Sequence, residues 1–125
     1  MSLCLAGAET LRLAVTAFTL AWTHSVEHVR WQEDWLVTPA GLELVAARVE
    51  GSGAGMEPGE GARRIGGWWA WPVDRPPQRE LVLAASGATG GGWTLCAAGG
   101  CREIGATPGA PLSLTACGQD QESQE

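Results

Sequence analysis

Two side chains that could act as an acid and a base, His24 and Glu33, fall among apolar residues in two alternating segments of the chain. Every second residue is apolar in residues 18–26, and His24 shares that face; Glu33 does the same in residues 29–37. A period of two predicts β-strands, and a polar group on the apolar face of a strand costs stability unless it is paired. The two side chains could therefore form an acid–base pair, or a structural pair that holds the strand register.

The two segments can form one antiparallel hairpin with both apolar faces on the same side. With the tightest turn, at residues 28–29, His24 lies opposite Glu33 and Trp22 opposite Trp35. A turn longer or shorter by two residues would leave His24 and Glu33 diagonal but still within reach. We therefore expect an inward hydrogen bond between them.

Other catalytic and metal chemistry is poorly supported around His24. Ser25 is adjacent to it, and adjacent residues of a strand point to opposite faces, so a serine-hydrolase arrangement is disfavoured. A metal site would need three or four convergent ligands, but the chain has only two histidines, and Glu27 faces away from His24. No metal and no cofactor are expected.

A glycine-rich segment, residues 50–61, matches neither a P-loop nor a dinucleotide-binding fingerprint. Its backbone N–H groups could bind an anion, or its glycines could permit a bulged crossing between sheets. Together with the hairpin, it supplies the candidate ligand-binding residues, which are Thr23, His24, Ser25, Glu27, Glu33, Gly53, Gly55 and Met56.

Tryptophans and cysteines are the other notable residues of this chain. Seven tryptophans suit a core, but Trp68, Trp69 and Trp71 could also form a dimer surface. A two-residue turn at 98–99 would place Cys96 opposite Cys101, at a separation that a disulfide can span. Free thiols are expected in a reducing compartment and a disulfide outside it.

Frequent glycines and prolines predict short strands and turns. The expected fold is all-β, an antiparallel β-sandwich or partly open barrel of about eight to ten short strands. One domain should span residues 1–114, followed by a disordered acidic tail at 115–125. The expected strands are residues 3–5, 11–15, 18–26, 31–37, 42–49, 66–72, 81–85, 93–97 and 100–104.

The net charge of -6 and the scattered arginines argue against nucleic-acid binding. No apolar stretch is long enough to span a membrane, and the first residues lack the basic region of a signal peptide. As written, the sequence predicts a cytoplasmic protein; a periplasmic or membrane-associated location is the alternative if a leader is missing.

Several strings in the chain resemble the bacterial domain of unknown function 1850 (DUF1850). Residues 23–27 (Thr-His-Ser-Val-Glu) and 53–56 (Gly-Ala-Gly-Met) carry the resemblance together with Glu33 and Trp35, and residues 81–84, 93–96 and 101–102 add to it. Members of that family have no established activity and tend to be encoded beside TAXI-type TRAP transporters, which are tripartite solute-uptake systems. The resemblance thus implies an accessory role in solute uptake.

Three classes of function follow from these observations. The favoured one is a non-enzymatic accessory or binding module that binds the transporter subunits or an anionic small solute. The second is an enzyme that uses His24 and Glu33 as an acid–base pair. The third is a structural or dimerising protein whose motifs serve the fold. The sequence does not specify the oligomeric state.

Overall fold

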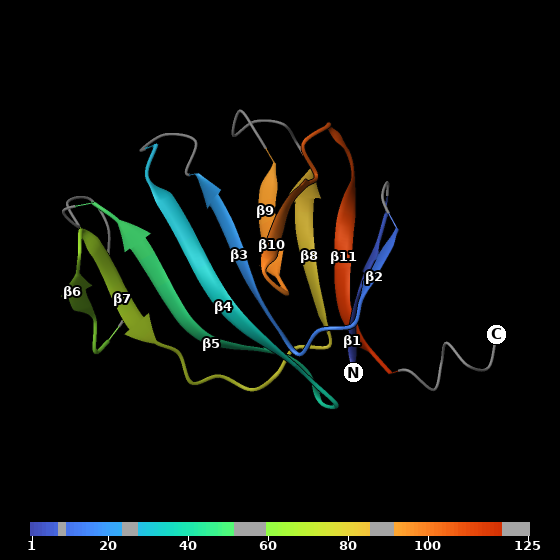
Figure 1. The fold of residues 1–125 in the computed structure, drawn as a ribbon, viewed down its shortest axis with the longest axis horizontal. Helices are drawn as coiled ribbons and strands as arrows, with labels where there is room; N and C mark the ends of the chain where they lie inside the picture. The colour runs from blue at the N-terminus through green and yellow to red at the C-terminus, as the bar shows by residue number, and fades with distance from the viewer. Residues whose placement is uncertain (8–9, 24–27, 52–59, 86–91, 119–125) are drawn as a thin grey trace.

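A computed structural model of the chain describes residues 1–7, 10–23, 28–51, 60–85 and 92–118. These ranges form eleven strands and contain no helix (Figure 1). The strands are β1 (Ser2–Ala6), β2 (Leu11–Leu13), β3 (Ala17–Thr23), β4 (Arg30–Thr38), β5 (Gly41–Glu50), β6 (Arg63–Ile65), β7 (Trp68–Pro72), β8 (Glu80–Ala85), β9 (Trp93–Ala97), β10 (Gly100–Ile104) and β11 (Gly109–Cys117).

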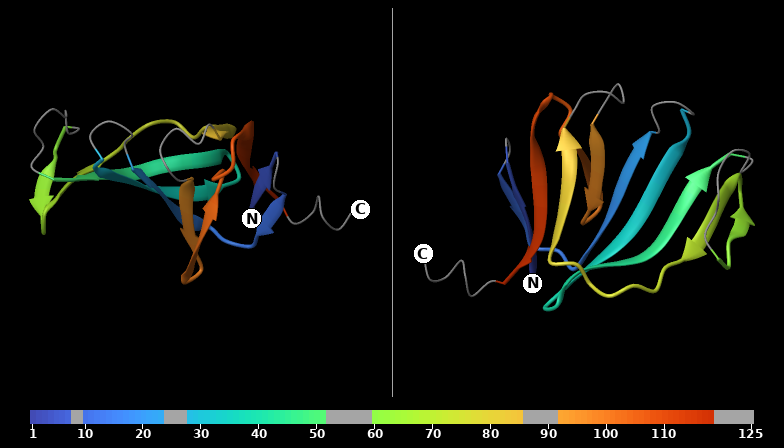
Figure 2. Two further views of the ribbon diagram at one scale, coloured as in Figure 1. Left: turned by 90° about the horizontal axis from the view of Figure 1, so that it is seen from above. Right: turned by 180° about the vertical axis from the view of Figure 1, so that it is seen from behind.

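The strands are divided between two sheets (Figure 2). A four-stranded sheet has the order β2-β1-β11-β8, and a seven-stranded sheet has the order β10-β9-β3-β4-β5-β7-β6. Every strand pairing in both sheets is antiparallel. The predicted all-β antiparallel class is therefore confirmed.

The apolar core lies between the inner faces of the two sheets. Alternate residues of β3 and β4 point into it, and Trp35, which is only 2% exposed, stacks on Phe18 across the hairpin at 6.2 Å between ring centroids. This alternation is the pattern that a half-buried strand requires. The cluster consists of Leu3, Leu5, Phe18, Leu20, Trp35, Val37, Leu42, Leu44, Leu83, Leu95, Ile104, Leu112 and Leu114.

Two strands were not predicted from the sequence. β6 is only three residues long and all three are exposed, so it has no alternation of buried and exposed residues. β11 is nine residues long, but Pro111 and a register shift between Gly109 and Leu112 interrupt its first half. It also runs to Cys117, so the strand extends three residues past the domain boundary expected at 114.

The seven-stranded sheet brings two distant parts of the chain to one edge. β3 and β5 both pair antiparallel with β4, so they run in the same direction. β3 and β5 therefore end, at Thr23 and Glu50, on the same side of the sheet. We call this row of strand ends the upper edge, because it lies at the top of the sheet in Figure 1. The segments that follow these strands are the two that the sequence singled out for binding.

Candidate functional site

Most of the predicted binding residues belong to segments attached to this upper edge. Thr23 is the last residue of β3 and is half-buried. Residues 24–27, with His24, Ser25 and Glu27, and residues 52–59, with Gly53, Gly55 and Met56, lie outside the described part of the chain.

The predicted register of the hairpin is wrong, although its two apolar faces do point the same way. Glu33 lies opposite Leu20, not His24, and Trp22 lies opposite Trp31, not Trp35. The connection spans residues 24–29, six residues in place of the two expected, which moves every pair by four positions.

Aromatic pairing explains the register that forms. The observed register places two aromatic residues opposite each other twice along the hairpin: Phe18 with Trp35, and Trp22 with Trp31. Both pairs stack, with centroids 6.2 Å apart and interplanar angles of 3° and 9°. Such pairs stabilise a hairpin more than one polar pair at its end.

Glu33 is a half-buried carboxylic acid on the inner face of the seven-stranded sheet. Its cross-strand neighbours are Leu20 and Ala47, and its Oε1 accepts a hydrogen bond of 3.1 Å from the indole N–H of Trp35. Burial raises the pKa of Glu33 above its ordinary value of 4.5, while the Trp35 hydrogen bond and the charge of Arg75 partly offset that rise. The group could therefore hold a proton at a higher pH than an exposed glutamate.

A row of half-buried tryptophans covers the inner face near Glu33. The Trp22 ring contacts Trp93, with centroids 5.0 Å apart, and Trp31 meets Trp71 edge to face at 6.2 Å. The indole N–H groups of Trp31 and Trp69 are buried and have no acceptor among the described residues. Such donors are rare in folded proteins and mark positions where another group could accept a hydrogen bond.

The three tryptophans that could form a dimer surface do not share one face of β7. Trp68 lies on the outer face, where the Arg30 guanidinium carbon is 5.8 Å from its ring centroid. Trp69 and Trp71 lie on the inner face, opposite Val49 and Ala47 of β5. A partner surface could therefore use Trp68 or the Trp69–Trp71 pair, but not all three together.

The outer face of the same sheet carries a charged network. Arg48 donates to the Asp34 carboxylate at 2.8 and 3.2 Å and to Gln32 at 2.6 Å, and Thr19 donates to Asp34 at 2.9 Å. Burial alone would raise the pKa of Asp34, but the hydrogen bonds from Arg48 and Thr19 outweigh it, so the pKa is lowered. This network keeps Asp34 ionised and satisfies Arg48.

A pocket of about 430 Å³ lies beside this network; Gln32 belongs to the network and also lines the pocket. Its lining includes Thr23, the last residue of β3. Its lining also includes residues that the sequence did not single out. These are Arg30, Gln32, Gly92, Thr94 and Glu103. Four of them alternate on the outer faces of β4, β9 and β10, a pattern that could have indicated them, and the fifth, Gly92, precedes β9.

Two disulfides cross-link the chain. Cys96 and Cys101 face each other across the β9–β10 hairpin, with Cα atoms 4.0 Å apart. The predicted turn at Ala98 and Gly99 is confirmed: both have positive φ, 53° and 80°, as a two-residue hairpin turn requires.

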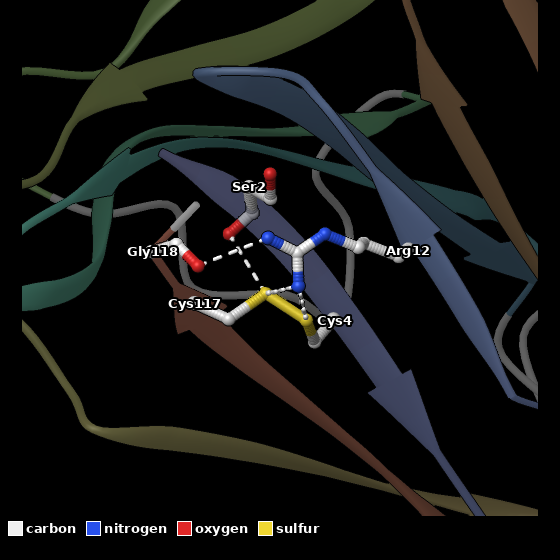
Figure 3. The surroundings of a disulfide bond; sticks show 5 residues. All are labelled: Ser2, Cys4, Arg12, Cys117 and Gly118. Atoms are coloured by element: carbon white, nitrogen blue, oxygen red, sulfur yellow. Dashed lines mark hydrogen bonds between the residues drawn. A yellow bond between two sulfur atoms is a disulfide. The ribbon is translucent and has the colours of Figure 1, made fainter. Parts of the chain in front are cut away.

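The second disulfide joins Cys4 of β1 to Cys117 of β11, which are 113 positions apart in sequence, with Cα atoms 6.0 Å apart. The Arg12 guanidinium lies against it, with Nη1 3.7 Å from both sulfurs and Nη2 donating to the Gly118 carbonyl at 2.9 Å (Figure 3). No short-range spacing indicates this pair, because only the pairing of β1 with β11 brings the two cysteines together.

A metal-binding cluster and a membrane-spanning helix are both absent from the part of the chain that the structure describes. In the described residues, no group of three or more histidine, cysteine, aspartate or glutamate side chains could hold a metal ion. No helix in the same part of the chain is long and apolar enough to cross a membrane.

The fold and these sites define a small all-β domain of two antiparallel sheets with a disulfide in each. The family model described as domain of unknown function (DUF1850) matches residues 18–104, which is more than half of the chain. The chain belongs to this family. No curated protein and no solved structure matches it.

Proposed function

We propose that this chain is a non-enzymatic binding module that acts as an accessory of a TAXI-type TRAP solute transporter. Its binding surface would be the upper edge of the seven-stranded sheet, formed by Thr23 and residues 24–27 and 52–59. The resemblance in sequence supports the link to the transporter.

The observation that carries the proposal is the common direction of β3 and β5. It attaches the two motif segments to one edge of one sheet, with a single strand between their attachment points. Neighbouring strands lie about 4.8 Å apart, so the two attachment points are separated by roughly 10 Å. Segments this close can contribute to one surface, as loops on a rigid scaffold commonly do.

The two disulfides support a location in an oxidising compartment, such as the periplasm. Structural disulfides persist there and are rare in a reducing cytosol. We therefore favour the periplasmic alternative over the cytoplasmic location expected from the sequence.

Co-purification from native membranes tests the transporter link. A tagged chain is solubilised together with the transporter encoded beside it. It should specifically recover the membrane subunit or the solute-binding subunit of that transporter. A Met56→Ala, Glu27→Ala variant should lose this recovery, whereas Ala40→Ser, at the opposite edge of the sheet, should retain it. Recovery of neither subunit by the native chain would refute the proposal.

An anionic small solute is the other partner that the surface could bind. Calorimetric titration of the native chain with small dicarboxylates and amino acids tests this possibility. The Met56→Ala, Glu27→Ala variant, called the edge variant, is titrated as the control. Binding that the edge variant leaves unchanged would place the solute elsewhere.

The second candidate function is an enzyme that uses His24 and Glu33, and the raised pKa of Glu33 is the observation in its favour. The register weakens it, because the cross-strand neighbour of Glu33 is Leu20. An activity that disappears in both Glu33→Gln and His24→Gln would favour the enzyme over the binding module.

A further inference from the structure

The Cys96–Cys101 disulfide is open to solvent at the end of a sheet. β10 is the edge strand of the seven-stranded sheet; Cys101 is exposed and Cys96 is half-buried. Both cysteines also line the pocket of about 430 Å³ on the outer face, which gives a small reactant room beside the sulfurs.

The Cys4–Cys117 disulfide is covered in comparison. Cys117 is only 5% exposed, and the Arg12 guanidinium lies 3.7 Å from each sulfur. The positive charge of Arg12 would stabilise a departing thiolate and so favour reduction, but an attacking thiolate must first reach a sulfur along the S–S axis. Access is therefore the deciding difference between the two disulfides.

The pocket beside Cys101 is lined by one acidic and one basic residue, Glu103 and Arg30. Glu103 lies two residues along β10 on the same face, and its Oε2 accepts a hydrogen bond of 3.0 Å from the Gly92 N–H. Arg30 also lines the pocket, but its guanidinium carbon lies over the Trp68 ring, 5.8 Å from the ring centroid. Because Glu103 is on the same strand and face as Cys101, we expect its carboxylate to attract a cation to this disulfide more than an anion.

We propose that Cys96–Cys101 is a thiol–disulfide exchange site whose preferred reactant is a thiol that also carries a positive charge, such as an aminothiol. The thiolate attacks the Cys101 sulfur, a mixed disulfide forms, and the S–S bond breaks with Cys96 leaving as a thiolate. A second thiolate then attacks the reactant's sulfur and releases Cys101. Two thiols become one disulfide, the protein disulfide becomes two thiols, and the two thiol protons end on Cys96 and Cys101.

Differential alkylation of the native chain tests the access argument and is independent of the proposed function. The folded protein is treated with a low concentration of cysteamine, quenched with an alkylating reagent and digested for mass spectrometry. Cys96 and Cys101 should be labelled well before Cys4 and Cys117. Labelling of Cys4 and Cys117 at the same rate or earlier would overturn the proposal.

Reactants of different charge test the role of Glu103. Reduction rates, corrected to equal thiolate concentration, should fall from cysteamine to 2-mercaptoethanol to 3-mercaptopropionate at low salt. Residues two apart on a strand, as Cys101 and Glu103 are, lie about 7 Å apart. A unit charge at that distance in water changes such a reduction rate by about threefold, and added salt should reduce the difference between the three reactants.

The variant Glu103→Gln should remove this order of reduction rates. The matched control is Glu60→Gln, which should retain the order, because Glu60 is exposed and does not line the pocket. The glutamine side-chain oxygen can still accept the Gly92 hydrogen bond, and unchanged tryptophan fluorescence would verify the fold. An order of rates that persists in Glu103→Gln would refute selection by this carboxylate.

Discussion

Removing the Cys4–Cys117 disulfide should strongly destabilise the chain without deleting a side chain of the apolar cluster. The double variant Cys4→Ala, Cys117→Ala keeps the pairing of β1 with β11, because that pairing depends on backbone hydrogen bonds from Ser2 to Ala6. The loss should therefore come mainly from the unfolded chain, which regains the freedom that the cross-link removes.

The magnitude follows from the length of the closed loop. The two cysteines are 113 positions apart, and closing a loop of that size is worth about 4.7 kcal/mol in the chain-entropy treatment. Cys96 and Cys101 are only 5 positions apart, for which the same treatment gives about 2 kcal/mol. The two double variants should therefore differ by more than about 2 kcal/mol in the free energy of unfolding.

Urea unfolding followed by tryptophan fluorescence measures both free energies. The Cys4→Ala, Cys117→Ala variant should also show a larger denaturant slope, because its unfolded chain exposes more surface without the cross-link. The variant Cys96→Ala, Cys101→Ala is the matched control, since it removes one disulfide but opens only a short loop. If the control loses as much stability as the long-loop variant, the loop-length argument is refuted.

Three further measurements check the site geometry. Glu33 has a raised pKa in the folded chain, so its contribution to stability is present below pH 4.5 and is lost as the pH rises through the folded pKa. Glu33→Gln should flatten that part of the stability–pH profile, and an unchanged profile would contradict the assignment. Asp34 has a lowered pKa, so its contribution is present above pH 3.8 and lost as the pH falls through the folded pKa. Arg48→Met should abolish that acid-side loss and cost at most about 1 kcal/mol at pH 7, because the pair is about one-third exposed; a larger cost in urea unfolding would show that the pair is more strongly coupled. A double-mutant cycle of Trp22→Ala and Trp31→Ala should give a coupling of about 1 kcal/mol, whereas zero coupling would mean that the two rings do not stack.

The hairpin shows how far residue alternation predicts structure. Alternation identified both strands and the inward position of Glu33, because it depends only on the period of a strand. The same pattern allowed several registers that differ by two residues, and it could not choose among them. The choice depends on which side chains pack best across the strands, and the aromatic stacking of Phe18 with Trp35 and of Trp22 with Trp31 became visible only in the structure.

The cysteines show the same division. Cys96 and Cys101 could be paired from sequence, because a hairpin with a two-residue turn places them opposite each other by local geometry. Cys4 and Cys117 could not, since their pairing depends on β1 and β11 being neighbours in the four-stranded sheet. A contact between the two ends of the chain is a result of the whole topology.

The sequence by itself determined the all-β class, most strand positions and the β9–β10 turn, because these depend on residue type and spacing within a few positions of the chain. The tertiary structure alone decided the hairpin register, the long-range disulfide and the pocket on the outer face. Each of these depends on side chains from strands distant in sequence. It also decided that the segments after Thr23 and Glu50 emerge from one edge, because the shared partner β4 makes β3 and β5 run in the same direction.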